Sequence, residues 1–377
     1  MEDPLGIGRV AFNNLPKDIF FDIFSRIPLK SLYRMRCVCQ KWQFFLDLDP
    51  EFRGFYHQKH KTSPILLYKN QNTENSSTQL SFHYFDSTQL HQLSTNFPQS
   101  ITSILNCNGI LCLISNSIVL LYDPITKRTS NLPISLNFSS TLSWAFGFSP
   151  IRNIFKVLHF YTIEINGSGN YCNAKQVMCE IITVSSSHLG LNSQKLWRFL
   201  GYCSYDILGR KDSAYVDGNI YWLIGATKSS TEYIKIMSFN VETEKFGVLC
   251  FPATYADISV ECLNLVEIKD KLCMTDRLPW ESTMNVWMMM EEEEGLANFW
   301  VHKYRIDLGV FHHDVKILGH LNKINSNAFE SEGEILVKLG ALRYGFYELE
   351  SDVFRKLVED NMPEWSLQHM VERKILL

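Results

Sequence analysis

The chain has 377 residues, of which 46% are apolar and 20% charged, so it is long enough for more than one domain and too apolar to be intrinsically disordered. Its net charge of -4 and isoelectric point near 6.3 exclude the strongly basic surface that binds nucleic acid or an anionic membrane. The first residues carry acids and no apolar core, and the longest apolar stretch, residues 110–122, is too short to span a bilayer. We therefore expect a globular protein of the cytoplasm or nucleus.

The ten cysteines are expected to be reduced thiols, because the cytosol and nucleus keep structural disulfides from persisting. The sequence has no Cys-x-x-Cys pair, which is the usual spacing of zinc ligands. Cys37 and Cys39 are two residues apart, and Cys107 and Cys112 are five apart. We therefore expect no metal site and no cofactor.

Apolar residues recur with a helical period near the amino terminus, where one stripe contains Ile19, Phe20, Ile23, Phe24 and Ile27. Pro16 suits the first turn of such a helix, because its missing N–H would have no partner there, and Pro28 would end the helix. Two further helical patterns follow and stop before the turn at Asp49-Pro50. We predict a unit of about three short helices, as the period indicates.

A helical unit of about forty residues cannot bury every large apolar side chain internally, because small domains bury only a modest share of their surface. Part of its apolar surface is therefore expected to face a partner. The alternative is that the unit packs on the rest of the chain as an ordinary helical subdomain.

Four blocks in this unit resemble the F-box: residues 15–19 (LPKDI), 25–32 (SRIPLKSL), 36–42 (RCVCQKW) and 49–52 (DPEF). The resemblance covers residues 10–57 and implies a three-helix module that binds a Skp-type adaptor, and through it cullin and RING subunits. It places the adaptor contacts at Leu15, Pro16, Ile19, Ile23, Leu29, Leu32, Val38 and Trp42.

Beyond residue 63 the pattern changes to short strands separated by turn residues. Residues 101–133 indicate a four-stranded meander with a turn at Asn108-Gly109, and residues 214–252 repeat the same order around Asp217-Gly218. A third copy surrounds Gly333, and weaker copies begin near residues 85 and 270. Such units must stack on one another to bury their apolar faces. We therefore predict an all-β domain, a β-propeller of kelch-like four-stranded blades, with a β-sandwich as the competing assembly.

Between these copies, residues 144–150, 155–160 and 197–198, together with residues 108–113 and 237–240, are similar to the F-box-associated domain of plant F-box proteins. This kelch-like resemblance covers most of residues 64–357 and implies a domain that captures a target protein. The expected organisation is an F-box domain at residues 10–57, a linker at 58–63, the β-propeller-like domain at 64–357 and a tail at 358–377.

Together the two resemblances imply a non-catalytic substrate-recognition subunit of an SCF-type (Skp–cullin–F-box) ubiquitin ligase, which recruits an unidentified target protein for ubiquitination and proteasomal degradation. One alternative is a propeller that binds or processes carbohydrate through its many aromatic residues. Another is a Skp-bound scaffold without a role in degradation. The sequence has no phosphate-binding glycine loop, nucleophile elbow or paired carboxylates in a convincing context, so no catalytic residue is predicted.

Target contacts are expected on loops of the β-rich domain, because loops carry recognition while strands supply a rigid frame. The longest irregular candidates are residues 161–175, rich in Gly and Asn, and residues 275–297, which contain Trp280 and the acidic run at 291–294. His312 and His313 are expected to point to opposite faces of a strand and so not to share a metal ion.

Overall fold

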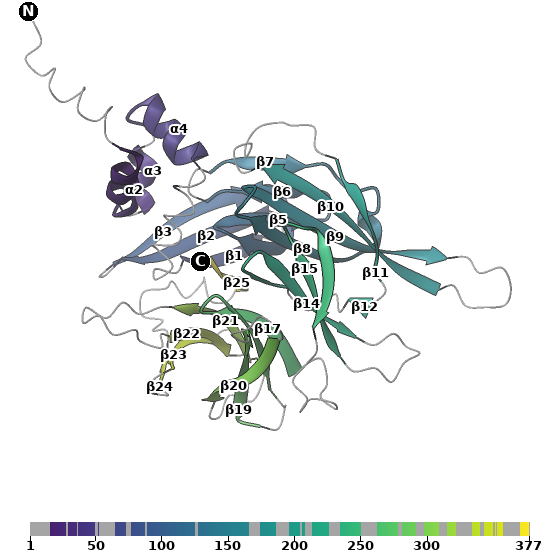
Figure 1. The fold of residues 1–377 in the computed structure, drawn as a ribbon. Coiled ribbons are helices and arrows are strands. Elements are labelled where there is room, and N and C mark those ends of the chain that lie inside the picture. The colour runs from purple at the N-terminus through teal and green to yellow at the C-terminus, as the bar shows by residue number, and fades with distance from the viewer. Residues whose placement is uncertain are drawn as a thin grey trace, which may run out of the picture.

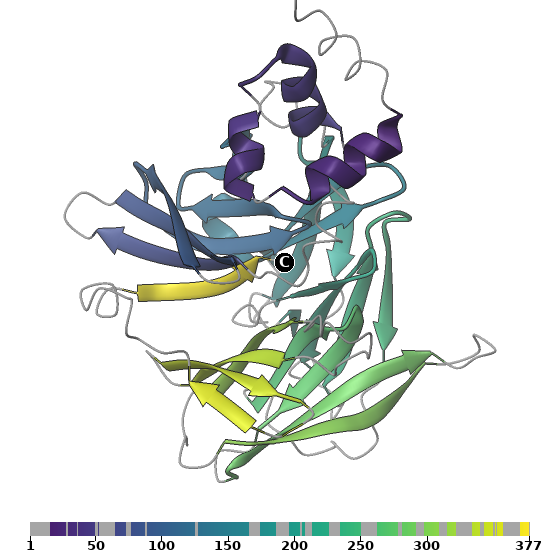
Figure 2. The same cartoon turned by 90° about the vertical axis from the view of Figure 1, so that its left-hand side faces the viewer.

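The computed structural model describes residues 16–27, 29–35, 37–49, 52, 65–72, 77–86, 89–124, 127–165, 174–185, 196–203, 206–207, 213–225, 234–249, 262–277, 281–291, 298–308, 315–321, 334–339, 343–349, 351, 353–356 and 370–376. Three short helices form the amino-terminal module in these ranges: α2 (Lys17–Ser25), α3 (Leu29–Met35) and α4 (Gln40–Leu48). They lie outside the β-rich part of the molecule (Figures 1 and 2). None of the described helices is long and apolar enough to cross a membrane.

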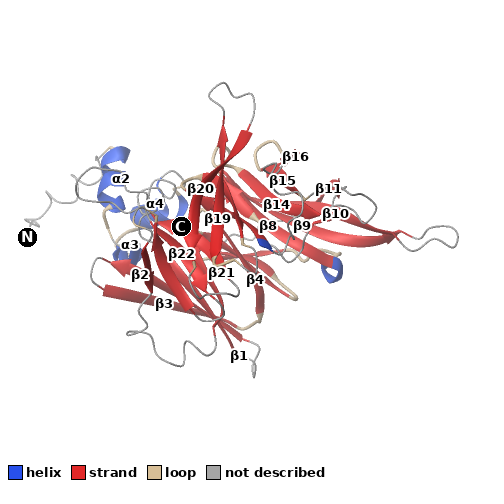
Figure 3. Ribbon diagram, turned by 90° about the horizontal axis from the view of Figure 1, so that it is seen from below, coloured by secondary structure: helices blue, strands red, loops and turns tan. Residues whose placement is uncertain are grey.

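The rest of the described chain folds into six antiparallel sheets (Figure 3). The first sheet contains β25 (Met370–Leu376), β1 (Ile65–Asn72), β2 (Ser77–Asp86) and β3 (Gln89–Phe97), paired in that order. The second contains β4 (Ile101–Cys107), β5 (Ile110–Ser115), β6 (Val119–Tyr122) and β7 (Thr129–Leu132). The third begins after the short 3₁₀ helix η1 (Phe138–Ser140) and contains β8 (Thr141–Ser149), β9 (Ile154–Ile165), β10 (Ala174–Ser185) and β11 (Arg198–Cys203).

In the remaining sheets consecutive strands also pair, except that β12 and β13 of the fourth sheet both pair with β14. The fourth contains β12 (Asp206–Ile207), β13 (Ala214–Val216), β14 (Asn219–Gly225), β15 (Lys235–Asn240) and β16 (Lys245–Leu249). The fifth contains β17 (Leu263–Ile268), β18 (Lys271–Asp276), β19 (Thr283–Glu291) and β20 (Asn298–Asp307). The sixth contains β21 (Val315–Leu321), β22 (Glu334–Leu339), β23 (Arg343–Glu348) and β24 (Val353–Lys356).

The sheets stack around a ring that the carboxy-terminal strand closes. The inner strands follow one another, β4 beside β8, β8 beside β14, β13 and β14 beside β17, and β17 beside β21. The last of these, β21, lies beside β25, which pairs with β1 of the first sheet. Residues 370–376, which the sequence predicts to lie in a tail, therefore belong to the ring. Radial stacking of four-stranded sheets is the predicted β-propeller, and its closure leaves only short, protected edges.

Burial on both faces explains why β5 and β14 have almost continuous apolar sequences. On β5, Ile110, Cys112 and Ile114 pack between the second and third sheets. The alternating residues Leu111 and Leu113 pack between the first and second sheets. Successive side chains of a strand point to opposite faces, and each sheet has a neighbour on both faces. The same division holds on β14, where Ile220 and Trp222 face one neighbour and Tyr221 and Leu223 face the other.

Tight hairpin turns occupy equivalent positions in the second, fourth and fifth sheets, where they join β4 to β5, β13 to β14 and β17 to β18. Asn108 and Gly109 have φ of 47° and 71°, and Asp217 and Gly218 have φ of 41° and 73°. Positive φ at both central residues is the backbone of the type I′ hairpin turn, which matches the twist of the flanking strands. Lys269 and Asp270 form the corresponding turn of the fifth sheet, with φ of 55° and 58°. These turns confirm the repeats predicted around residues 109, 218 and 270.

Gly147 lies where the third sheet comes close to the fourth. A Cβ at this position would lie 2.7 Å from Val241 Cγ2 and 2.9 Å from Ile220 Cδ1, and both of those side chains are fully buried. Forcing an extra methyl group into a packed core costs about 1–3 kcal/mol. We expect Gly147→Ala to lower the free energy of unfolding by that amount in urea denaturation.

Gly247→Ala is the matched control for this prediction. A Cβ at Gly247 would meet Ser238 Oγ at 2.8 Å, and that hydroxyl group can rotate away. The control should therefore lose much less stability. If both variants lost the same free energy of unfolding, close packing of the third and fourth sheets would not restrict the size of the side chain at residue 147.

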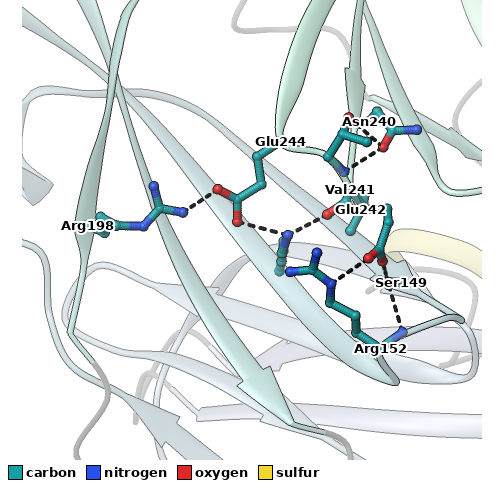
Figure 4. A network of polar contacts seen from close by, with 9 residues as sticks. Ser149, Arg152, Arg198, Asn240, Val241, Glu242 and Glu244 are labelled. Carbon is teal, nitrogen blue, oxygen red and sulfur yellow. Dashed lines mark hydrogen bonds and ion pairs between the residues drawn. The ribbon is translucent and has the colours of Figure 1, made fainter.

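A polar network joins the same two sheets at the turn after β15 (Figure 4). The Lys156 side chain, only 1% exposed, donates to the Val241 carbonyl oxygen at 2.5 Å and pairs with Glu244 Oε1 at 2.8 Å. Arg198 of β11 donates to the other oxygen of Glu244. Burial raises the pKa of Glu244, but the hydrogen bonds and charges of Lys156 and Arg198 outweigh it and hold this pKa below its ordinary value. The buried ammonium group thus has a carboxylate partner on the neighbouring sheet.

Glu242 makes a second, more exposed connection in this network. Its Oε1 pairs with Arg152 Nε at 2.5 Å, and its Oε2 accepts a hydrogen bond from the Ser149 hydroxyl group. The hydrogen bond from Ser149 and the charge of Arg152 lower the pKa of Glu242. Both carboxylates are therefore charged at neutral pH.

Candidate functional site

The helical module has an aromatic core of its own. Phe20 and Phe24, one turn apart on α2, stack with ring centroids 5.8 Å apart, and Phe24 meets Trp42 of α4 edge-on at 5.0 Å. The buried residues are Phe20, Phe24, Leu32, Leu46 and Phe52, and Phe21, Ile27, Met35, Trp42 and Phe45 pack against them. This core fixes the helices relative to one another without help from the propeller.

Polar contacts around Asp49 tie the start of α2 to the end of α4. Lys17 Nζ pairs with Asp49 Oδ2 at 3.2 Å, and Asp49 Oδ1 accepts a hydrogen bond of 3.0 Å from the backbone N–H of Phe52. The Lys17 ammonium group also lies 5.2 Å from the centroid of the Phe21 ring. In the sequence Asp49 is recognisable only as a turn residue, so its role in positioning α2 appears only in the structure.

A second apolar stripe on α2 points away from this core. Ile19 and Ile23 are 46% and 39% exposed, and residues four apart lie on one face of a helix. Each isoleucine precedes a core phenylalanine by one position, which rotates it by about 100° around the helix axis. Exposed aliphatic side chains lose the roughly 1.5–3 kcal/mol each that burial would give. The exposed stripe is thus suited to covering by a partner protein.

The predicted adaptor-binding residues fall into three groups in the structure. Pro16, Ile19, Ile23 and Val38 are exposed, and Val38, in the turn between α3 and α4, is 63% exposed. Leu32 is buried and Trp42 is half-buried, both within the core of the module. Leu29 begins α3, but its side chain and all of Leu15 lie outside the described residues. Among the predicted residues whose side chains the structure describes, the exposed group is the most accessible to a partner, and the adaptor contacts themselves stay a prediction.

Strands extend into both segments predicted as irregular target-binding loops. β9 continues to Ile165 and β10 starts at Ala174, so much of residues 161–175 is a hairpin. β19 and β20 likewise form a hairpin through most of residues 283–307. The prediction of irregular structure is wrong for the described strand residues of both segments, as at Tyr161, Ile163 and Ile165, whose alternation with polar residues is typical of a strand. Residues 166–173, 278–280 and 292–297, with Trp280 and most of the acidic run, lie outside the described residues, as do His312 and His313.

These features define a class of protein in which a small helical module with an exposed apolar stripe precedes a β-propeller closed by its last strand. Residues 12–53 match the F-box domain family, and residues 55–351 match the F-box associated beta propeller domain family. The chain therefore belongs to the F-box proteins that have an F-box associated beta propeller domain.

Related chains include several F-box proteins of Arabidopsis thaliana. F-box protein At3g07870 is 27% identical over 327 residues, which cover 81% of this chain and 75% of that protein. Putative F-box only protein 9 is 22% identical over 337 residues, covering 86% of this chain and 84% of that protein. Among solved structures, the β-propeller domain of the trilobed protease from Pyrococcus furiosus aligns with a TM-score of 0.37 at 7% identity, covering 81% of this chain and 98% of that one.

The two domains together support a general role in substrate recognition within SCF ubiquitin ligases, where F-box domains generally bind a Skp-type adaptor. Members of this family are typically receptor subunits.

Proposed function

We propose that this chain is the substrate-recognition subunit of an SCF-type ubiquitin ligase that directs one or more target proteins to ubiquitination and proteasomal degradation. The F-box helices bind the Skp-type adaptor, and the propeller captures the target. The observation that carries the proposal is the exposed stripe of Ile19 and Ile23 on a module whose core is complete without it. Ubiquitin transfer itself falls to the enzymes that the adaptor, cullin and RING subunits assemble.

The propeller supports this division of labour because its packed sheets do not include the exposed stripe of α2. Apolar clusters join each described sheet to the next from the first to the sixth, and β25, which lies beside β21 and pairs with β1, closes the ring. A rigid frame of this kind can hold target-binding loops in fixed positions. The position of a captured target relative to the adaptor then depends on how the two domains are joined.

The tryptophans give no support to a carbohydrate-binding propeller. Stacking on sugars needs exposed aromatic faces. Each tryptophan that the structure describes is buried or half-buried: Trp42, Trp144, Trp197, Trp222, Trp287 and Trp300. Trp222, for example, packs edge-on against Phe160 between the third and fourth sheets with ring centroids 5.4 Å apart. These tryptophans are therefore packed as core residues are, and do not present an open face to a sugar.

Proximity labelling with and without proteasome inhibition tests the degradation role. The wild-type chain and the double variant Ile19→Asp/Ile23→Asp, which keeps the propeller intact, are compared in the same cells. Both the wild type and the variant should label the targets. The amounts of these targets should rise on proteasome inhibition in cells with the wild type, and should not change in cells with the variant. If the amounts of the labelled proteins are the same with and without the inhibitor, and the same for the wild type and the variant, the chain is a Skp-bound scaffold instead.

A further inference from the structure

A small cavity opens at the outer edge of the ring between the third and fourth sheets. Its volume is about 220 Å³. Cys179 of β10 and Met237 of β15 form its buried floor. Tyr202 and Cys203 of β11 and Phe246 and Val248 of β16 line its mouth. We call this cavity the β11–β16 pocket.

The pocket is the unfilled outer end of an otherwise packed interface. Further in, large side chains such as Phe160 and Trp222 fill the space between the same two sheets. Towards the outer strands the facing residues are the smaller Cys179 and Cys203 and the flexible Met237. These smaller side chains leave room for a ligand between the two sheets.

The lining is apolar and rich in sulfur. Cys203 Sγ lies 3.8 Å from Met237 Sδ. Burial raises the pKa of the Cys179 thiol, so this group stays uncharged at neutral pH. Thiol and thioether sulfurs are polarisable and make favourable contacts with aromatic rings. An uncharged guest therefore meets no unpaired charge among the lining residues.

The mouth of the pocket is unusually apolar for an exposed surface. Tyr202 is 62% exposed, and Phe246 and Val248 are each more than a third exposed. Phe199 lies beside Tyr202, with ring centroids 5.5 Å apart, but does not itself line the pocket. Single exposed apolar residues are common on soluble proteins, but several gathered around one cavity mark a binding site.

We propose that the β11–β16 pocket binds an uncharged aromatic ring of benzene to indole size, supplied by a small molecule or by an aromatic side chain of a captured protein. A dry apolar cavity of about 150 Å³ binds benzene in another protein, so the volume here suits a ring of one or two cycles. Aromatic rim residues can stack on such a ring while the sulfurs contact it from below. The inference goes beyond the proposed function and does not require the adaptor, because the pocket lies in the propeller.

The half-buried thiol of Cys203 reports whether the pocket is occupied in the unaltered full-length chain. Its alkylation by N-ethylmaleimide is followed by peptide mass spectrometry while indole is titrated. A bound ring covers Cys203, so alkylation should slow about tenfold when indole is present at ten times its Kd. Cys37 and Cys39, which are exposed on the helical module, serve as internal controls and should react at unchanged rates. An unchanged rate at Cys203 up to the solubility limit of indole would overturn the proposal.

A pair of variants places the binding event in the pocket. Cys203→Phe puts a ring into the mouth, whereas Lys245→Phe adds the same ring at an exposed position of β16 that does not line the pocket. The methyl NMR signal of Met237, assigned with Met237→Leu, should shift with indole in the wild type and in Lys245→Phe but not in Cys203→Phe. A shift that survives in Cys203→Phe, or none in the wild type, would contradict the proposed site.

Two probes separate the possible sources of the ring. Indole represents a free small molecule, and the peptide acetyl-Gly-Trp-Gly-amide presents the same ring as a side chain. Protection of Cys203 by the peptide at a lower concentration than by indole would indicate a protein ligand. Protection by indole alone would indicate a small molecule. If neither probe protects Cys203, the pocket is not an aromatic-binding site.

Discussion

Changing Ile19 and Ile23 together to Asp should weaken binding of a Skp-type adaptor by about 10- to 100-fold, because a partner that covers the exposed 46% and 39% of these residues gains about 1.3–2.6 kcal/mol in total from them. Both side chains are exposed, so the substitution leaves no cavity in the core of the module. Isothermal titration calorimetry gives the affinity. Circular dichroism of the same samples should show that the helices remain folded.

The propeller offers a matched control for this variant. Ile134 and Ile151 are also exposed isoleucines, at 56% and 83%, but lie in connections between strands of the propeller rather than on the helical module. The double change of these two residues to Asp should leave adaptor binding unchanged. The α2 stripe would not be part of the adaptor interface if Ile19→Asp/Ile23→Asp bound the adaptor with wild-type affinity, or if the control variant lost as much affinity.

Glu244→Leu should destabilise the propeller by about 3 kcal/mol, because it leaves the ammonium group of Lys156 buried without its carboxylate. Loss of one partner of a buried pair usually costs about 3–5 kcal/mol, and the partial exposure of Glu244 favours the lower end. Lys156→Met is the matched comparison, since it removes the buried charge and leaves Glu244 paired with Arg198. Urea denaturation should show the smaller loss for Lys156→Met. A larger loss for Lys156→Met than for Glu244→Leu would contradict this account.

The same variant predicts a change in the pH dependence of stability. The folded-state pKa of Glu244 is lowered, so its contribution is fully present above the unfolded pKa near 4.5 and is lost as the pH falls through the folded pKa. Wild-type stability should therefore fall more steeply below about pH 4.5 than that of Glu244→Leu. If the free energies of unfolding of the two proteins fell in parallel with pH, Lys156 and Arg198 would not stabilise the charged form of Glu244.

Much of the propeller can be predicted from local sequence, because hairpin turns and strand alternation are local signals. Asn108-Gly109 and Asp217-Gly218 adopt the positive φ angles that such pairs favour. The closing strand is different. Residues 370–376 have no hairpin partner nearby in sequence, since their partner β1 begins at Ile65. Long-range pairing of this kind leaves no local pattern, so the sequence indicated a tail instead of the strand that completes the first sheet.

The candidate sites show a similar limit. Helical periodicity groups Ile19, Phe20, Ile23 and Phe24 into one apolar stripe, but it cannot say which half faces the core. The structure buries the phenylalanines and exposes the isoleucines, because α4 packs on the former through Trp42 and Phe45. The β11–β16 pocket had no sequence signal at all. Its residues come from four strands of two sheets, each unremarkable by itself.

Hydrogen exchange of the full-length chain with and without the Skp-type adaptor tests the central claim most directly. Binding stabilises the elements that contact the adaptor against local opening, so their amides exchange more slowly. We expect slower exchange in α2 (Lys17–Ser25) and in the turn that contains Val38, with no change in the propeller strands β5 and β14. An adaptor that fails to bind, or that slows exchange in the sheets while α2 is unaffected, would contradict it.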